Sequence, residues 1–419
     1  MQLHPAQSSN PLVLFLRAFL LAVLASGTVQ TLPAQSMVAP AVNDANLTTP
    51  VENPATSLMP PVTNPTSTSN FFSWDALVLH PQVSVRYLTT DGLQVQPGRK
   101  SKTSITSVSP GIAAQWGQHL SLRYVWMRNH YSNNEFRNGV DQSGGINWQT
   151  QYHDWQFFAG HDYTRTDSSL IETSAQTRQT THNSTFNVLR SVAPGYSLDT
   201  TLSQSLTYND LYADPKTWSA REMVHRKSAQ HFDAAVGAQY SYTALPKSPD
   251  IGALQYLGSF TWKPIDTFNA GAEVGYETRH VYSKIPLNDH NPVFNGSLNY
   301  IPSKLTRMSL SASRSSSTSL YDNLITVVTA YGFTIEKTLV KRLSATAACS
   351  RQETDYKSTR QDLSTSRKDT TDTINLGLHT PLFTKLHVAL SYQYSSNASN
   401  ILAYKFSTNQ YSVELGYNF

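Results

Sequence analysis

The chain has 419 residues, only 14% of them Asp, Glu, Lys or Arg, and its formal net charge is +4. Ordinary soluble proteins carry about 25% charged residues, and a mean hydropathy of −0.37 excludes a bundle of membrane-spanning helices. The small, scattered positive charge leaves no footprint for nucleic acid. The single cysteine, Cys349, excludes an internal disulfide and a lipid-modified N-terminal cysteine. Few charges, many polar residues and 22 tyrosines suit strands with one apolar and one wet face.

The N-terminus has the pattern of a secretory signal peptide. Residues 11–25 form an apolar run interrupted by Arg17, and small residues follow at 25–27 and 34–36. We therefore expect a signal peptide over 1–35, with cleavage near 34–36. The alternative, an uncleaved anchor, would need a longer apolar run without Arg17.

Residues 36–72 are rich in Pro, Thr and Asn and contain no Lys or Arg. Such a segment cannot bury a core, so we expect a disordered periplasmic segment. Two roles are open for it, a tether in the periplasm or a plug inside a pore, and the tether is preferred.

From residue 76 onward the chain alternates apolar and polar residues over long stretches. In Phe268–Tyr282, Ala270, Ala272, Val274 and Tyr276 share the parity of Phe268, and polar residues or glycine occupy most of the other positions. Stretches of roughly 9–17 residues exceed the usual five or six of soluble strands and match a tilted crossing of a bilayer. A sheet edge cannot lie in lipid, so the sheet must close. The prediction is an all-β fold, a closed antiparallel transmembrane β-barrel over 73–419.

Turn lengths predict the strand count and the orientation. Short links, such as 117–118, 194–195 and 383–385, alternate with longer polar links, such as 90–103, 167–180 and 210–226. Short turns lie in the periplasm and long loops outside. The predicted count is 16 strands, with 18 as the alternative. Two counts stay open because the up or down direction of the strands, read forward from residue 76 and backward from residue 419, disagrees between residues 210 and 265.

The last strand carries the strongest signal. Apolar or aromatic residues alternate with polar or small ones up to the C-terminal carboxylate, and they are Tyr411, Val413, Leu415, Tyr417 and Phe419. A terminal aromatic strand resembles the signal that outer-membrane insertion machinery recognises. The alternative is a buried edge strand of a soluble sheet.

Four passages carry a resemblance to a known family: 108–112, 273–277, 300–315 and 409–419. Together they resemble outer-membrane β-barrel proteins of the β-barrel porin type associated with exopolysaccharide loci. The resemblance implies a location in the bacterial outer membrane and a role in polysaccharide export or surface display. It implies no catalytic residues.

We find no phosphate-binding loop, no paired metal ligands and no nucleophile motif in the sequence. We therefore expect no catalytic residues, no cofactor and no metal, and an enzyme assembled from neighbouring strands is the less favoured interpretation. If the aromatic parity faces lipid, eleven charged residues face the interior: Arg86, Arg123, Asp162, Asp199, Asp233, Glu273, Glu277, Arg279, Arg307, Glu336 and Glu414. Seven acidic against four basic groups predict a weak cation preference, unless the charges pair across strands and only fill the interior.

The function expected from the sequence is a porin-like channel that passes small hydrophilic solutes or assists polysaccharide export. The alternative is a non-conducting structural or surface-display barrel with a plugged lumen. The expected partners are outer-membrane lipid and lipopolysaccharide, the barrel-assembly machinery and a polysaccharide, with no nucleic acid. Basic residues in the expected loops 90–103, 210–226 and 353–368 either contact acidic glycans or are simply solvated.

Overall fold

The computed structural model describes residues 72–74, 76–228, 231–283, 287–340, 342–359 and 367–419. The expected signal peptide and nearly all of the expected disordered segment lie outside these residues, so the described part tests neither. No helix in the described ranges is long and apolar enough to cross a membrane. The described chain is almost entirely strand, with one short 3₁₀ turn at Leu402–Tyr404.

The strands in the described part are, in chain order, β1 (Phe72–Trp74), β2 (Leu77–Gln96), β3 (Arg99–Trp116), β4 (Leu120–Tyr131), β5 (Gly139–Tyr152), β6 (Trp155–Leu170), β7 (Ala175–Ala193), β8 (Tyr196–Asn209), β9 (Lys216–Ser228), β10 (Phe232–Ala244), β11 (Ile251–Ile265), β12 (Phe268–Val281), β13 (Leu287–Ser303), β14 (Thr306–Thr318), β15 (Leu324–Val340), β16 (Leu343–Ser358), β17 (Lys368–Pro381), β18 (Leu386–Ser399) and β19 (Phe406–Asn418).

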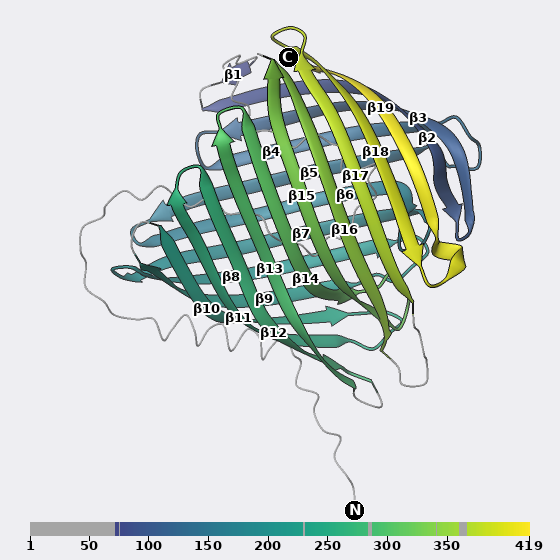
Figure 1. The fold of residues 1–419 in the computed structure, drawn as a ribbon. Coiled ribbons are helices and arrows are strands. Elements are labelled where there is room, and N and C mark those ends of the chain that lie inside the picture. Colours follow the sequence, from purple (N-terminus) through teal and green to yellow (C-terminus); the bar gives the residue numbers. More distant parts are fainter. Residues whose placement is uncertain (1–71, 75, 229–230, 284–286, 341, 360–366) are drawn as a thin grey trace, which may run out of the picture. The chain divides into compact units, whose positions relative to one another are not determined.

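Strands β2 to β19 form a closed barrel. Each pairs antiparallel with the next in the chain, and β19 pairs with β2, with Tyr411 opposite Thr89 and Tyr417 opposite Val83. Closure leaves no long edge strand, as a sheet in lipid requires. β1 pairs only with the first residues of β2, beyond the end of β19. Figure 1 shows β12 to β19 on one wall and β2 to β9 on the opposite wall.

The barrel therefore has 18 strands in the described residues, the higher of the two expected counts. The expected count of 16 strands missed β9, which begins at Lys216 inside the stretch expected to be the long link 210–226. That expectation is wrong in its second half. β9 lacks a clean apolar parity, because Glu222 shares the face of Val224 while Met223 shares the face of Arg221.

Turns at one end of the barrel are short, as expected. The β3–β4, β5–β6 and β7–β8 links have two or three residues, and Gly117, His153 and Gly195 take positive φ angles in them. At the other end several strands run further than expected. β2 and β3 continue to a two-residue turn at Pro97 and Gly98, so the expected loop 90–103 is mostly strand. By turn length, this second end is extracellular.

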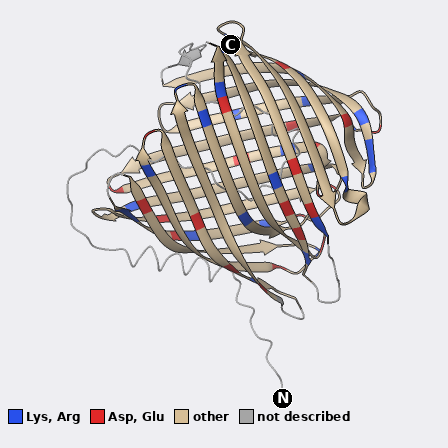
Figure 2. Ribbon diagram, viewed as in Figure 1, with Lys and Arg blue, Asp and Glu red and all other residues tan. Residues whose placement is uncertain are grey.

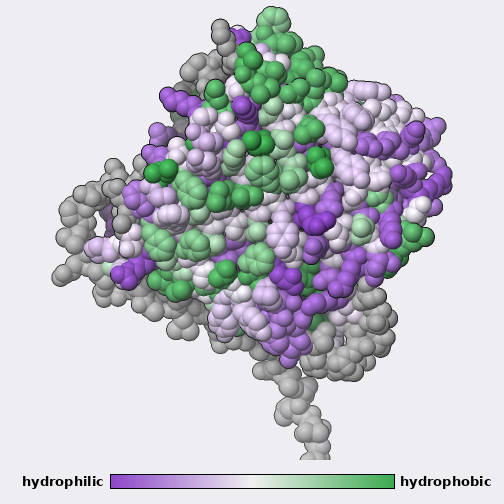
Figure 3. Space-filling view, in the orientation of Figure 1, coloured by the Kyte–Doolittle hydropathy of each residue, from purple (hydrophilic) through white to green (hydrophobic). Residues whose placement is uncertain are grey.

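The outer face is an apolar belt. Exposed side chains on this face include Val85, Tyr256, Leu376, Leu390 and Val413. On each strand the outward side chains occupy every second position. In Figure 3 hydrophobic residues gather over the part of the visible wall nearer the C-terminus, while hydrophilic ones gather at the opposite strand ends. The terminal aromatics Tyr411, Tyr417 and Phe419 are likewise exposed on the outside. Exposed apolar side chains in this pattern are stable only against lipid.

The inner face is polar, with a few small apolar clusters. One cluster joins Leu88, Ile105 and Tyr131, and another joins Met223 and Leu257. Charged residues are thinly scattered along the strands (Figure 2).

Candidate functional site

Strand pairing places all eleven predicted interior residues on the parity opposite to the apolar belt. Directly opposite residues of an antiparallel pair share a face, so Arg86 and Glu414 lie side by side, and so do Arg307 and Glu336. By the same rule, all eleven residues share a face with buried interior side chains such as Leu88 and Met223.

Several of these charges form ion pairs, some across strands and one within β12. Arg123 donates to Asp162 at 2.8 Å, and Arg279 lies 3.1 Å from Glu277. Glu273 pairs with Arg221 of β9. Arg221 was expected in a loop, where it was grouped with basic residues that meet glycans or solvent. That assignment is wrong, because β9 carries Arg221 on the inner face.

Asp199 and Asp233 approach a common imidazole. The Nδ1 atom of His225 lies 3.2 Å from Asp233, and its Nε2 atom lies 3.8 Å from Asp199. Asn187 donates to Asp199 at 2.5 Å. The described residues contain no group of three or more His, Cys, Asp or Glu side chains arranged to hold a metal ion.

Exposure of the inner side chains changes along the barrel. Near the periplasmic ends, the side chains of Arg123 and Asp162 are 52% and 44% exposed. Toward the extracellular ends, Glu277, Gln393 and Ser395 are each 1% exposed. The interior is therefore open to water at one end and filled at the other.

The filling segment is the tip of the β6–β7 hairpin, residues 167–177. Thr173, Ser174 and Thr177 have no exposed surface, and Asp167 is 1% exposed. Ser174 closes the turn with a positive φ of 50°. The sequence predicts a long loop outside the barrel over residues 167–180. The structure instead continues both strands and buries their connection.

Contacts of the hairpin tip reach strands that are far away in the ring. Ser169 donates to the carbonyl of Gln94 on β2 at 2.7 Å. Glu172 accepts hydrogen bonds from Ser319 Oγ and the Leu320 amide, at 2.5 and 2.9 Å, in the β14–β15 loop. Because these partners are not sheet neighbours of β6 or β7, the tip must cross the extracellular opening to reach them.

Arg367 holds the tip from the opposite wall. Its Nη1 donates to the Glu172 carbonyl at 2.9 Å, and its Nε lies 3.0 Å from Asp369 Oδ2. The guanidinium also lies over the rings of Tyr404 and Tyr356, 3.5 and 4.3 Å from their centroids. Burial raises the pKa of the Glu172 carboxyl above its ordinary value. We name these contacts between Glu172, Arg367 and Asp369 the latch.

The latch corrects a second part of the basic-loop expectation. Arg367 is 6% exposed and is committed to the interior, and Lys357 binds Asp289 at 3.0 Å. Neither belongs to a free basic surface. Sequence offered no signal for the tip or the latch, since a Ser- and Thr-rich connection has the same composition whether it lies outside or folds inward.

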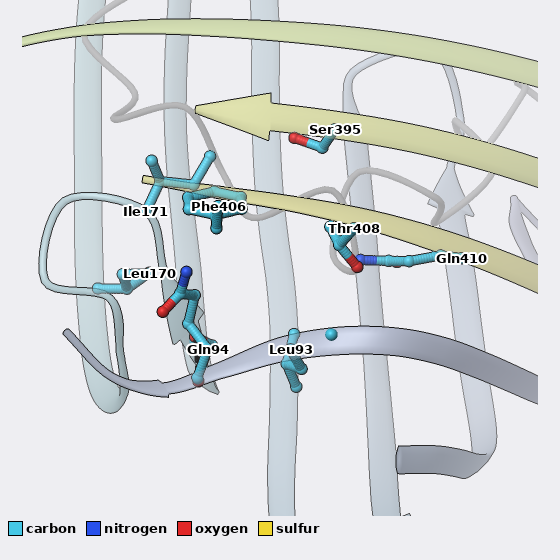
Figure 4. Close-up of a pocket in the computed structure, with 10 residues that line it drawn as sticks. Leu93, Gln94, Leu170, Ile171, Ser395, Phe406, Thr408 and Gln410 are labelled. Atoms are coloured by element: carbon cyan, nitrogen blue, oxygen red, sulfur yellow. Dashed lines mark hydrogen bonds between the residues drawn. The ribbon is translucent and has the colours of Figure 1, made fainter. Parts of the chain in front are cut away.

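A small cavity lies between the tip and the β18–β19 wall. Figure 4 shows Leu170 and Ile171 of the tip facing Phe406, Thr408 and Gln94 across it. It has room for about one water molecule. The residues that line it carry no charge, and they are Gly92, Leu93, Gln94, Ser169, Leu170, Ile171, Ser395, Phe406, Thr408 and Gln410.

Three polar atoms of this lining have no hydrogen-bond partner in the described chain: Gln94 Oε1, Ser395 Oγ and Gln410 Oε1. Their residues are at most 6% exposed. Buried polar groups in native proteins nearly always find a partner. The cavity is therefore a polar space of a size that fits one water molecule.

A closed antiparallel barrel with an apolar outer belt and a polar interior defines the class, a transmembrane β-barrel of the porin-like kind. Residues 255–419 match the family described as "Putative beta-barrel porin 2". This match confirms the family expected from sequence over that part of the chain, and it supports the location in the bacterial outer membrane. A search of curated proteins gave no match.

Solved structures of similar shape are outer-membrane proteins of low sequence identity. OccAB3 of Acinetobacter baumannii is 12% identical, covering 82% of this chain and 99% of that chain, with a TM-score of 0.45. OccK11 of Pseudomonas aeruginosa is 10% identical, covering 82% and 96%, with a TM-score of 0.42. OccK2 of Pseudomonas aeruginosa, solved with glucuronate, is 10% identical, covering 81% and 98%, with a TM-score of 0.44.

Proposed function

We propose that the protein is a non-enzymatic channel for small hydrophilic solutes, closed at its extracellular end by the β6–β7 tip. The observation that supports this most directly is the change along the interior, from exposed charged walls to a filled end. One hairpin makes the closure, and it is held mainly by polar contacts that a modest free energy can break. A barrel of 18 strands otherwise leaves room for water inside.

The chemistry of the cavity beside the tip favours uncharged, hydroxyl-bearing solutes. Gln94, Ser395 and Gln410 offer amide and hydroxyl groups without a neighbouring charge in the cavity lining. Sugar hydroxyls both donate and accept hydrogen bonds, so they match such a lining. This is consistent with a place in carbohydrate traffic across the outer membrane, including assistance to polysaccharide export.

The charged walls below the tip support a weak cation preference for small ions. The predicted set holds seven carboxylates and four arginines. Below the tip the structure adds Arg221 and Lys227 of β9 to this inner face. These two cations narrow the acidic excess, and the ion pairs of Arg123, Arg221 and Arg279 weaken the field that it produces.

The second candidate is a non-conducting structural or surface-display barrel. The complete burial of Thr173 and Ser174 favours it, because these side chains are as inaccessible to water as those of a protein core. In that case the latch serves stability and never opens. The lipopolysaccharide contacts and the assembly machinery expected from sequence fit either candidate.

A shortened hairpin separates the two candidates. Ser169 and Gln176 face each other in register, so a two-residue Asn-Gly turn can join them in place of 170–175. The shortened protein should show stable current in planar bilayers, at least tenfold above the wild-type chain. Deletion of 36–72 is the matched control for a plug made by that segment. A shortened barrel that folds but passes no current would contradict the channel.

A further inference from the structure

The apolar belt is interrupted on the outer face of β6 to β9. Strand pairing places six polar side chains there, and we name them the outer polar patch: His161, His182, Ser184, Thr200, Gln204 and Glu222. They share the face of exposed Phe186 and Val224, so they lie outside the barrel.

The depth of the patch puts it against hydrocarbon. Tyr196 and Phe232 mark the periplasmic ends of β8 and β10 with exposed aromatic rings. Glu222 lies six residues from the end of β9 at Ser228. Tilted strands rise about 2–2.5 Å per residue along the barrel axis, which places Glu222 roughly 12–15 Å above that end, near the middle of a belt about 25 Å tall.

The polar groups of the patch are arranged in pairs. Thr200 Oγ1 donates to Glu222 at 2.8 Å, and His161 Nδ1 lies 2.9 Å from Ser184 Oγ. His182 packs between the rings of Tyr163 and Tyr208. Single pairs of this kind do not satisfy every polar atom of a carboxylate or an imidazole. Polar side chains in a membrane usually face protein or water, and seldom lipid tails.

We infer that the outer polar patch is the contact surface between two copies of this chain in the membrane. Two features select a second copy. The patch has a carboxylate on β9 and two imidazoles on β6 and β7, so adjacent copies can set the acid of one against a histidine of the other. Glu222 is also flanked on the same face by Ala220 and Ala238, and small side chains allow two walls to approach closely.

Cysteine cross-linking in native outer membranes tests this inference independently of conduction. The background is Cys349→Ser, because Cys349 is exposed on the outer face. The test variants are Glu222→Cys alone and His161→Cys with Glu222→Cys. The control is Ala272→Cys with Leu390→Cys, outward positions on β12 and β18. We expect disulfide-linked dimers or larger species from at least one test variant and none from the control.

A second measurement uses Glu222→Leu, which makes the centre of the patch apolar. The wild-type protein should scatter light as a multimer after mild detergent extraction, and the variant should lose at least half of that multimer while still folding. A wild-type protein that is monomeric and forms no cross-link at the patch overturns the inference. So does an equal yield of cross-links at the control positions.

Discussion

Replacing Arg367 by methionine should open the extracellular end. The variant loses the bond to the Glu172 carbonyl and both ring contacts, and it leaves Asp369, 4% exposed, without its cation. Breaking a buried pair in this way costs about 3–5 kcal/mol. Since each 1.4 kcal/mol is a factor of about ten, the ratio of open to closed tips should rise roughly 10²- to 4 × 10³-fold.

Single-channel recording in planar bilayers measures that ratio as the fraction of time spent open. The matched control is Arg351→Met, on the neighbouring stretch of the same wall. Arg351 also pairs with an aspartate, Asp372, but both side chains are largely exposed on the outside, so the pair contributes little. An Arg367→Met barrel that folds yet gates like the wild type would refute the latch.

Further predictions concern pH, selectivity and assembly. Burial raises the pKa of the Glu172 carboxyl in the closed state. The protonated carboxyl therefore stabilises the closed state fully at pH values below the ordinary pKa of about 4.5, and this stabilisation is lost as the pH rises through the raised pKa. The fraction of time spent open should grow with pH, and Glu172→Gln should flatten this pH dependence. The double variant Asp199→Asn with Asp233→Asn removes two interior carboxylates and should move the reversal potential in a KCl gradient toward anion selectivity, whereas Asp372→Asn on the outside should leave it unchanged. Phe419→Ala removes the terminal aromatic ring, which is exposed on the outer face. At equal expression, this variant should reduce the amount of folded barrel in outer membranes several-fold, as measured by heat-modifiable migration on gels. An undiminished yield would mean that the ring is not needed for insertion.

The walls of the barrel follow from sequence because one physical rule governs them. A strand between lipid and water must alternate apolar and polar side chains, so the sequence predicts β12, β18 and β19 from outward apolar residues such as Val274, Leu390 and Val413. The rule fails where a strand is polar on both faces. The rule misses β9, because Glu222 points outward and Arg221 inward.

The filled end of the barrel could not be foreseen for a different reason. Its contacts join segments far apart in sequence, as in the bond from Ser319 to Glu172, and no local pattern encodes such pairing. Residues of the tip are Ser, Thr and Gln for the most part, which suit an exposed loop equally well. Arg367 likewise has no feature that separates a buried cation from one in solvent.

Nitroxide scanning along β19 tests the central claim most directly, that alternate side chains touch lipid on a closed sheet. Spin labels would replace residues 410 to 417 one at a time in the Cys349→Ser background, in reconstituted membranes. Collision with dissolved oxygen should be high at 411, 413, 415 and 417 and low at 410, 412, 414 and 416. Equal oxygen collision on both parities, or water access on the outer one, would contradict the barrel.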